Sequence, residues 1–82
     1  HGGYVFTLAD STFAFACNSH GYRAVASGCS IEYLAPVQVD EVLTAEARET
    51  ALEGRSGIYD VTVSNAQGTL VALFRGRSRR VP

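Results

Sequence analysis

The sequence predicts a small α+β domain in which one apolar helix is enclosed by an antiparallel sheet. Three observations lead to this expectation: an apolar helical segment near the start, alternating strand patterns after it, and short turns between the last strands. The chain has 82 residues, which is enough for a single domain over 1–82. Strands joined by short turns pair antiparallel, so we expect a meander that curls about the helix.

The first element is a helix predicted over 4–17. Apolar side chains occupy nearly every position, a pattern typical of a helix that other structure covers on most sides. Asp10 is the only charged residue in it, and helical spacing places it on one stripe with Phe6 and Phe13. Because an isolated carboxylate is costly to bury, Asp10 is either a functional acid or an ordinary one, held by neighbouring hydroxyl groups or turned to solvent.

Two glycines, Gly2 and Gly3, precede this helix. The first N–H groups of a helix have no partner inside it, and they carry the positive end of its dipole. Glycine has no side chain to keep another group away from these donors. We therefore expect an oxyanion-binding site for a carbonyl oxygen at this end of the helix.

Strands and turns follow the helix. The turn over 18–21 ends it, and His20 is expected to be a solvated loop residue. In order, the predicted segments are a strand over 22–35, a connection over 36–41, a strand over 42–53, a turn over 54–57, a strand over 58–64, a hairpin turn over 65–68 and a strand over 69–80. The last strand is apolar on both faces over 70–74, as in a central strand.

Alternation assigns faces to these strands. One face of the first strand is expected to carry Val25, Ser27, Cys29, Ile31 and Tyr33, and the strand over 58–64 is expected to turn Tyr59, Val61 and Val63 inward. In the first strand, small residues around Gly28 either admit a close neighbour or mark a bulge.

Composition excludes several classes of protein. A net charge of −1 and an apolar fraction of 46% argue against disorder, nucleic-acid binding and a membrane span. Cys17 and Cys29 lack the spacing of a metal site, so we expect no metal or cofactor and two reduced thiols in a cytoplasmic protein. Arg75, Arg77 and Arg79 alternate along the last strand, where they meet phosphates or form a solvated face.

Linked motifs carry a resemblance to a known family. His1-Gly2-Gly3, followed by the segments 6–10 and 13–19, resembles the signature of hotdog-fold acyl-CoA thioesterases of the phenylacetic-acid-degradation (PaaI) type. Segments 28–36, 59–63 and 72–76 are similar to later strands of that family. The resemblance implies a homodimer paired through the strand after the helix, often as a dimer of dimers. The family's first helix and strand precede its His-Gly-Gly motif, so we expect a hotdog domain truncated at its N-terminus.

The same resemblance implies an activity and a set of residues. The activity is hydrolysis of acyl-CoA thioesters, typically aryl-acetyl ones such as phenylacetyl-CoA. The catalytic carboxylate falls on Asp10, the oxyanion donor on the backbone N–H of Gly2 and the motif histidine on His1, while Tyr33 falls where related branches contact the acyl group. Further candidates are Phe6 and Phe13 for the acyl pocket, unless they are plain core, and Arg55, Arg77 and Arg79 for the phosphates of CoA.

Spacing alone argues that two subunits share the site. Gly2 and Asp10 are eight residues apart, so they lie roughly 12 Å apart along one helix. A reacting thioester needs both groups within about 3 Å, so the Asp10 in question belongs to a partner subunit, as nucleophile or as general base. The alternatives are a non-catalytic hotdog module for dimerisation or acyl-CoA binding and, with less support, a hotdog dehydratase or hydratase.

Overall fold

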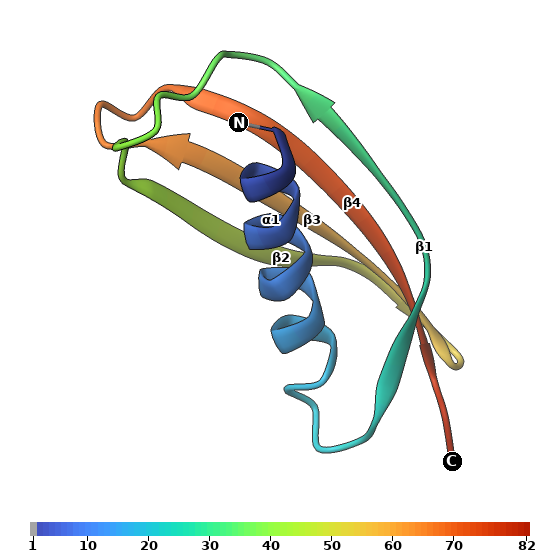
Figure 1. Ribbon diagram of the computed structural model, residues 1–82. Helices are drawn as coiled ribbons and strands as arrows, with labels where there is room; N and C mark the ends of the chain where they lie inside the picture. The colour runs from blue at the N-terminus through green and yellow to red at the C-terminus, as the bar shows by residue number, and fades with distance from the viewer. Residues whose placement is uncertain (1) are drawn as a thin grey trace.

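The computed structural model describes residues 2–82 as one helix and one antiparallel sheet (Figure 1). In chain order the elements are α1 (Gly2–Cys17), β1 (Ala24–Tyr33), β2 (Leu43–Glu53), β3 (Ser56–Asn65) and β4 (Leu70–Arg80). The strands lie in the order β1-β4-β3-β2, and each neighbouring pair is antiparallel. The sheet curves around α1, which lies against its concave face (Figure 1). The predicted α+β class and the order of elements are confirmed.

Helix α1 packs on the sheet through one stripe of side chains. The buried members of this stripe, four residues apart, are Val5, Ala9, Phe13 and Cys17. Phe15, by contrast, is 81% exposed and Tyr4 is 55% exposed. The expectation that other structure covers the helix on most sides is therefore wrong for the described chain, because the four strands reach only one side of it. The helix also begins at Gly2, two residues earlier than predicted.

The inner face of the sheet forms the rest of the core. Its buried side chains are Tyr59, Val61 and Val63 on β3 and Val71, Ala72 and Phe74 on β4, which confirms the predicted facing of β3. The ring of Phe13 lies 5.9 Å from that of Tyr59 and 5.7 Å from that of Phe74. A Cβ atom at Gly76 would lie only 2.7 Å from the ring of Phe13, so a glycine at this position lets the helix sit close to β4.

The outer face of the sheet is open. Strand β4 lies between β1 and β3, as its apolar sequence predicts. However, Leu73 is 42% exposed on the face away from the helix. The expectation that β4 is covered on both faces is wrong here, because α1 is the only described helix and it lies on the other side.

Strand β1 contains a bulge. Its register with β4 shifts between Ala26 and Gly28, which confirms the bulge alternative. The extra residue moves later side chains to the opposite face: Val25 pairs with the exposed Arg79, whereas Cys29 pairs with the buried Gly76. The prediction that Val25 and Cys29 share a face is therefore wrong, since strict alternation does not survive a bulge.

The chain turns where the sequence predicts, although the turn predicted over 54–57 is shorter, because β3 already begins at Ser56. Gly54 and Gly68 adopt φ angles of +59° and +84°, a region that side chains disfavour. In the hairpin after β3, the side-chain oxygen of Asn65 accepts hydrogen bonds from the backbone N–H groups of Gln67 and Thr69.

Candidate active site

The first turn of α1 meets the end of β1. The Tyr33 hydroxyl donates a hydrogen bond of 3.1 Å to the Gly2 carbonyl. A shallow apolar cleft of about 310 Å³ opens beside this contact, lined by Gly2, Val5, Tyr33, Ala35, Pro36 and Val37. The structure thus brings together two of the predicted site residues, Gly2 and Tyr33. The walls at Val5 and Val37 were missed, because an apolar residue in a helix or a connection carries no signal of what it lies beside.

Asp10 lies on a flank of α1 that faces the β1 edge of the sheet. It is half-buried and shares this flank with Phe6, one turn earlier. The ring of Phe6 lies 5.8 Å from that of Phe74, and Phe74 pairs with Ile31 of β1. Since one helix carries both groups, the separation of roughly 12 Å between Gly2 and Asp10 holds in the folded chain.

The Asp10 carboxylate has no hydrogen-bond donor among residues 2–82. Two neighbouring hydroxyl groups are engaged elsewhere: Thr7 donates to the carbonyl of Gly3 at 2.9 Å and Thr12 to that of Leu8 at 2.8 Å. The third, on Ser11, is exposed and makes no hydrogen bond to Asp10. The alternative in which nearby hydroxyls hold Asp10 is therefore wrong. A half-buried carboxylate without a donor is a candidate to act on a substrate or on water.

The two candidate aromatic residues of α1 differ. Phe13 is 1% exposed and lies in the core between Tyr59 and Phe74, so the plain-core alternative applies to it. Phe6 is partly buried against the same core. Neither ring lines the cleft beside Gly2.

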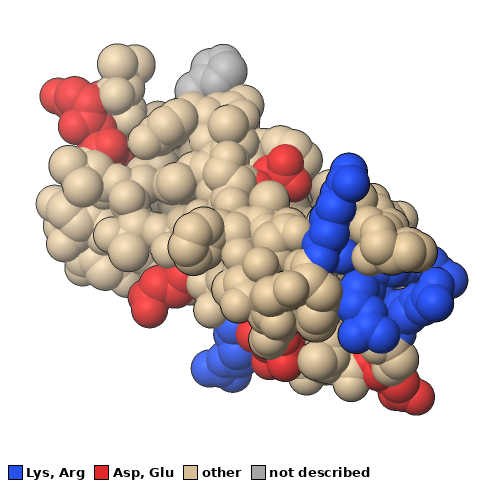
Figure 2. Space-filling model, turned by 90° about the horizontal axis from the view of Figure 1, so that it is seen from below, with Lys and Arg blue, Asp and Glu red and all other residues tan. Residues whose placement is uncertain are grey.

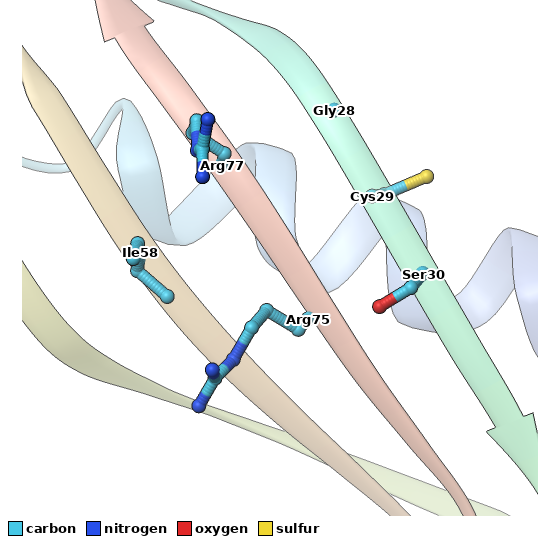
Figure 3. A pocket seen from close by; sticks show the side chains of 6 residues that line it. All are labelled: Gly28, Cys29, Ser30, Ile58, Arg75 and Arg77. Atoms are coloured by element: carbon cyan, nitrogen blue, oxygen red, sulfur yellow. The ribbon is translucent and has the colours of Figure 1, made fainter.

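The candidate arginines lie away from Gly2. Arg77 and Arg79 are exposed and alternate with the buried Gly76 and Ser78, so they project from the outer face of β4. Figure 3 shows Arg75 and Arg77 on this face, with α1 behind the sheet; they line a cavity of about 220 Å³ with Gly28, Cys29, Ser30 and Ile58. Figure 2 shows arginine side chains gathered at one end of the molecule.

Distance along the strand separates these arginines from the helix start. Tyr33, beside Gly2, pairs with Ala72, and Arg77 lies five residues further along β4, or roughly 16 Å away. Arg55 lies in the turn between β2 and β3, where its carbonyl accepts a hydrogen bond of 2.7 Å from the N–H of Arg80. Within one chain, none of the three candidate arginines lies near Gly2.

His20 lies exposed in the turn after α1, as the sequence predicts, but it also makes contacts that the sequence does not reveal. Its Nε2 atom lies 2.5 Å from Glu49 Oε2 and 3.0 Å from the hydroxyl of Tyr59, which in turn donates to Glu49 at 2.9 Å. Burial, followed by the hydrogen bond to Glu49, raises the pKa of the Tyr59 hydroxyl. The ring of His20 also stacks on that of Tyr22. This cluster lies at the other end of α1 from Gly2, so His20 is not part of the same site.

Three further expectations concern His1, metal binding and a membrane span. His1 lies outside the described residues. Within residues 2–82, no group of three or more side chains is placed to hold a metal ion. In the same part of the chain, no helix has both the length and the apolar character needed to cross a membrane.

A single helix cradled by a curved antiparallel sheet defines a hotdog fold, and the comparisons agree. The model of the thioesterase superfamily matches residues 1–72. The acyl-coenzyme A thioesterase PaaI of Escherichia coli is 48% identical over 81 residues, which are 99% of this chain and 58% of that protein. The chain belongs to the thioesterase superfamily.

Solved structures give the same result. The structure of E. coli PaaI superposes with a TM-score of 0.95, covering 100% of this chain and 59% of that one, so this chain spans about three fifths of its relative. The TT0310 protein of Thermus thermophilus has a TM-score of 0.93 at 42% identity, covering 99% of this chain and 68% of that one. The Streptococcus mutans protein smu.793, solved with acetyl CoA, has a TM-score of 0.92 at 31% identity, covering 99% and 65%.

Proposed function

We propose that the protein is an enzyme that hydrolyses acyl-CoA thioesters to the free acid and CoA. The observation that carries the proposal is the 48% identity, over nearly the whole chain, to a protein named as an acyl-coenzyme A thioesterase. That relative is described as part of the phenylacetic acid degradation operon of E. coli, so aryl-acetyl thioesters such as phenylacetyl-CoA are the proposed substrates. The acetyl CoA bound to smu.793 supports the same class of ligand. Two free cysteines suit a cytoplasmic location.

The proposed reaction uses Gly2 of one subunit and Asp10 of the other. The N–H of Gly2, at the positive end of the helix dipole, binds the carbonyl oxygen and the negative charge that develops on it. Asp10 either attacks the carbonyl carbon, giving a mixed anhydride that water then opens, or takes a proton from an attacking water. In both routes the carbon–sulfur bond breaks and CoA leaves as a thiolate. His1 is proposed to orient the substrate or the loop around it.

A two-fold dimer through the edge of β1 would bring Gly2 of one subunit near Asp10 of the other. Strand β1 pairs only with β4 in the described chain, so its other edge is open to a second copy. The flank with Asp10 faces this edge, and Gly2 lies beside Tyr33 at the end of the same strand. Two antiparallel copies of β1 would therefore carry the Gly2 end of each helix toward Asp10 of the other. A dimer of dimers is the proposed larger assembly.

The remaining candidates take supporting roles in this proposal. Phe6, which is partly buried on the flank of Asp10, and Tyr33, in the cleft beside Gly2, are placed to border the acyl group. Arg55, Arg77 and Arg79 lie too far from Gly2 within one chain, so they would bind the phosphates of a CoA held by a neighbouring subunit.

The first experiment tests Asp10 directly. Hydrolysis of phenylacetyl-CoA by the wild type and by Asp10→Asn is followed through the released thiol, with the exposed loop variant Asp40→Asn as the matched control. Loss of the base or nucleophile should lower kcat by about 100-fold or more, while the control stays near wild type. Equal activity in Asp10→Asn and wild type would refute the mechanism. A wild type that binds CoA thioesters without hydrolysing them would favour a non-catalytic hotdog module.

The second experiment tests whether two subunits share each site. Gly2→Pro removes the proposed donor, and the first turn of a helix tolerates proline. When inactive Asp10→Asn and Gly2→Pro subunits exchange at random, half of the dimers are mixed, and each mixed dimer has one intact site. About a quarter of the wild-type activity should return. If no activity returns while subunit exchange is measurable, the site does not cross the two-fold axis.

A further inference from the structure

Tyr33 holds the start of α1 against the sheet. Its hydroxyl donates to the carbonyl of Gly2 at 3.1 Å, and a Cβ atom built on Gly2 would lie 3.6 Å from the Cζ atom of the ring. The backbone of Tyr33 is itself anchored, because it pairs with Ala72 and the next residue, Leu34, donates to the carbonyl of Val71 at 2.8 Å. Tyr33, whose strand is hydrogen-bonded to the central strand β4, therefore contacts Gly2 at the start of α1.

The first turn of the helix is the part that most needs such an anchor. It begins with Gly2 and Gly3, whose backbones have the widest conformational freedom, and helix ends fray. The first turn carries no acidic side chain to stabilise it. The hydroxyl of Thr7 holds the carbonyl of Gly3, but that contact lies within the helix and does not tie it to the sheet.

The tethered carbonyl controls the direction of the neighbouring N–H groups. The C=O of Gly2 lies in one rigid peptide plane with the N–H of Gly3. It also shares a Cα atom with the N–H of Gly2, the proposed oxyanion donor. A hydrogen bond that orients this carbonyl therefore restricts the N–H vectors on both sides of it.

We propose that Tyr33 is a positioning residue, which acts through Gly2 by orienting the oxyanion donors at the start of α1. This proposal rests on the proposed thioesterase function. It differs from a contact between Tyr33 and the acyl group, because the carbonyl oxygen is common to every thioester while the acyl group is not. A positioning role predicts the same effect on all acyl-CoA substrates and an effect on kcat rather than on KM.

The kinetic test uses Tyr33→Phe, which keeps the ring and removes the hydroxyl. The matched control is Tyr4→Phe: Tyr4 is 55% exposed against 52% for Tyr33, and its hydroxyl bonds to no residue within 2–82. Hydrolysis of acetyl-CoA, hexanoyl-CoA and phenylacetyl-CoA is measured for both variants. In Tyr33→Phe, kcat should fall about fivefold for all three substrates, equivalent to about 1 kcal/mol, with KM changed less than about twofold. Tyr4→Phe should behave as wild type.

Other kinetic outcomes overturn the proposal. A loss confined to phenylacetyl-CoA, or a rise in KM with kcat unchanged, would mean that the Tyr33 hydroxyl acts on the acyl group and not through Gly2. A Tyr33→Phe variant that matches Tyr4→Phe in every parameter would mean that the hydroxyl orients nothing.

A second measurement does not depend on turnover. In an α-helix the N–H of Phe6 donates to the carbonyl of Gly2, so its hydrogen exchange reports on the first turn. This amide should exchange about fivefold faster in Tyr33→Phe and at the wild-type rate in Tyr4→Phe. If the wild type hydrolyses no CoA thioester, the proposed function fails, and amide exchange still decides whether Tyr33 fixes the helix start. Unchanged exchange at Phe6 would refute the tether.

Discussion

The close approach of α1 to β4 can be tested by adding one methyl group. In Gly76→Ala the new Cβ atom would lie 2.7 Å from the ring of Phe13, closer than two carbon atoms can approach. The ring has little room to move, because Phe13 is 1% exposed and lies between Tyr59 and Phe74. Overpacking of this kind costs about 2 kcal/mol. In a domain of 82 residues, that corresponds to a fall in Tm of about 10 °C.

Gly28→Ala is the matched control for this prediction. Gly28 lies on the neighbouring strand β1 without a positive φ angle, and nothing lies within 4 Å of a Cβ atom built on it. The same substitution there should leave the free energy of unfolding unchanged or raise it by up to about 1 kcal/mol. Urea unfolding followed by circular dichroism measures both variants. If Gly76→Ala were as stable as Gly28→Ala, the reasoning from the contact with Phe13 would be wrong.

A double variant identifies the cause of the lost stability in Gly76→Ala. Phe13→Leu removes the ring atoms that the new methyl group would meet, so Gly76→Ala should cost less in that background than in the wild type. Phe13 also lies three residues after Asp10 on the same helix. A displaced ring should therefore move the proposed catalytic acid, and Gly76→Ala should lower kcat.

Two further predictions concern titration and thiol reactivity. Hydrogen bonds from Arg75 lower the pKa of Asp60 to about 2, from a usual value of 3.8. The ionised carboxylate therefore stabilises the fold above about pH 4, and this contribution is lost as the pH falls through about 2. In urea unfolding, the difference in stability between wild type and Asp60→Asn should disappear over that pH range. The difference should be modest, since solvent reaches both side chains. A difference that stays constant with pH would contradict the assignment. Burial raises the pKa of the Cys17 thiol. In Cys29→Ser, the remaining thiol should react with Ellman's reagent only on unfolding, and rapid reaction in the native state would contradict its burial.

The helix and the inner face of β3 could be predicted from the sequence because both depend on local periodicity. Apolar residues four apart, such as Ala9 and Phe13, form the buried stripe of α1, and Val61 and Val63 alternate with polar residues on β3. The turn at Gly68 was equally predictable, because its positive φ angle is a local requirement.

Features that depend on distant residues could not be predicted in the same way. The contacts of His20 could not be predicted, because its partners, Glu49 and Tyr59, lie 29 and 39 residues further along the chain. The face of Cys29 depended on one bulged residue in β1, and small residues there fitted two interpretations equally well. Phe15 is apolar yet 81% exposed, because the sequence of a helix does not reveal how many of its sides the described strands will cover.

The candidate site likewise combines a local feature of the sequence with contacts between distant residues. The sequence by itself determined the spacing of the two proposed groups, a glycine start and one acid eight residues later on the same helix, since helical geometry converts that spacing directly into distance. Only the tertiary structure decided that Tyr33 lies against Gly2 and that Arg77 lies on the opposite face of the sheet. Those placements follow from the pairing of β1 with β4, whose register is set by contacts between residues far apart in the chain.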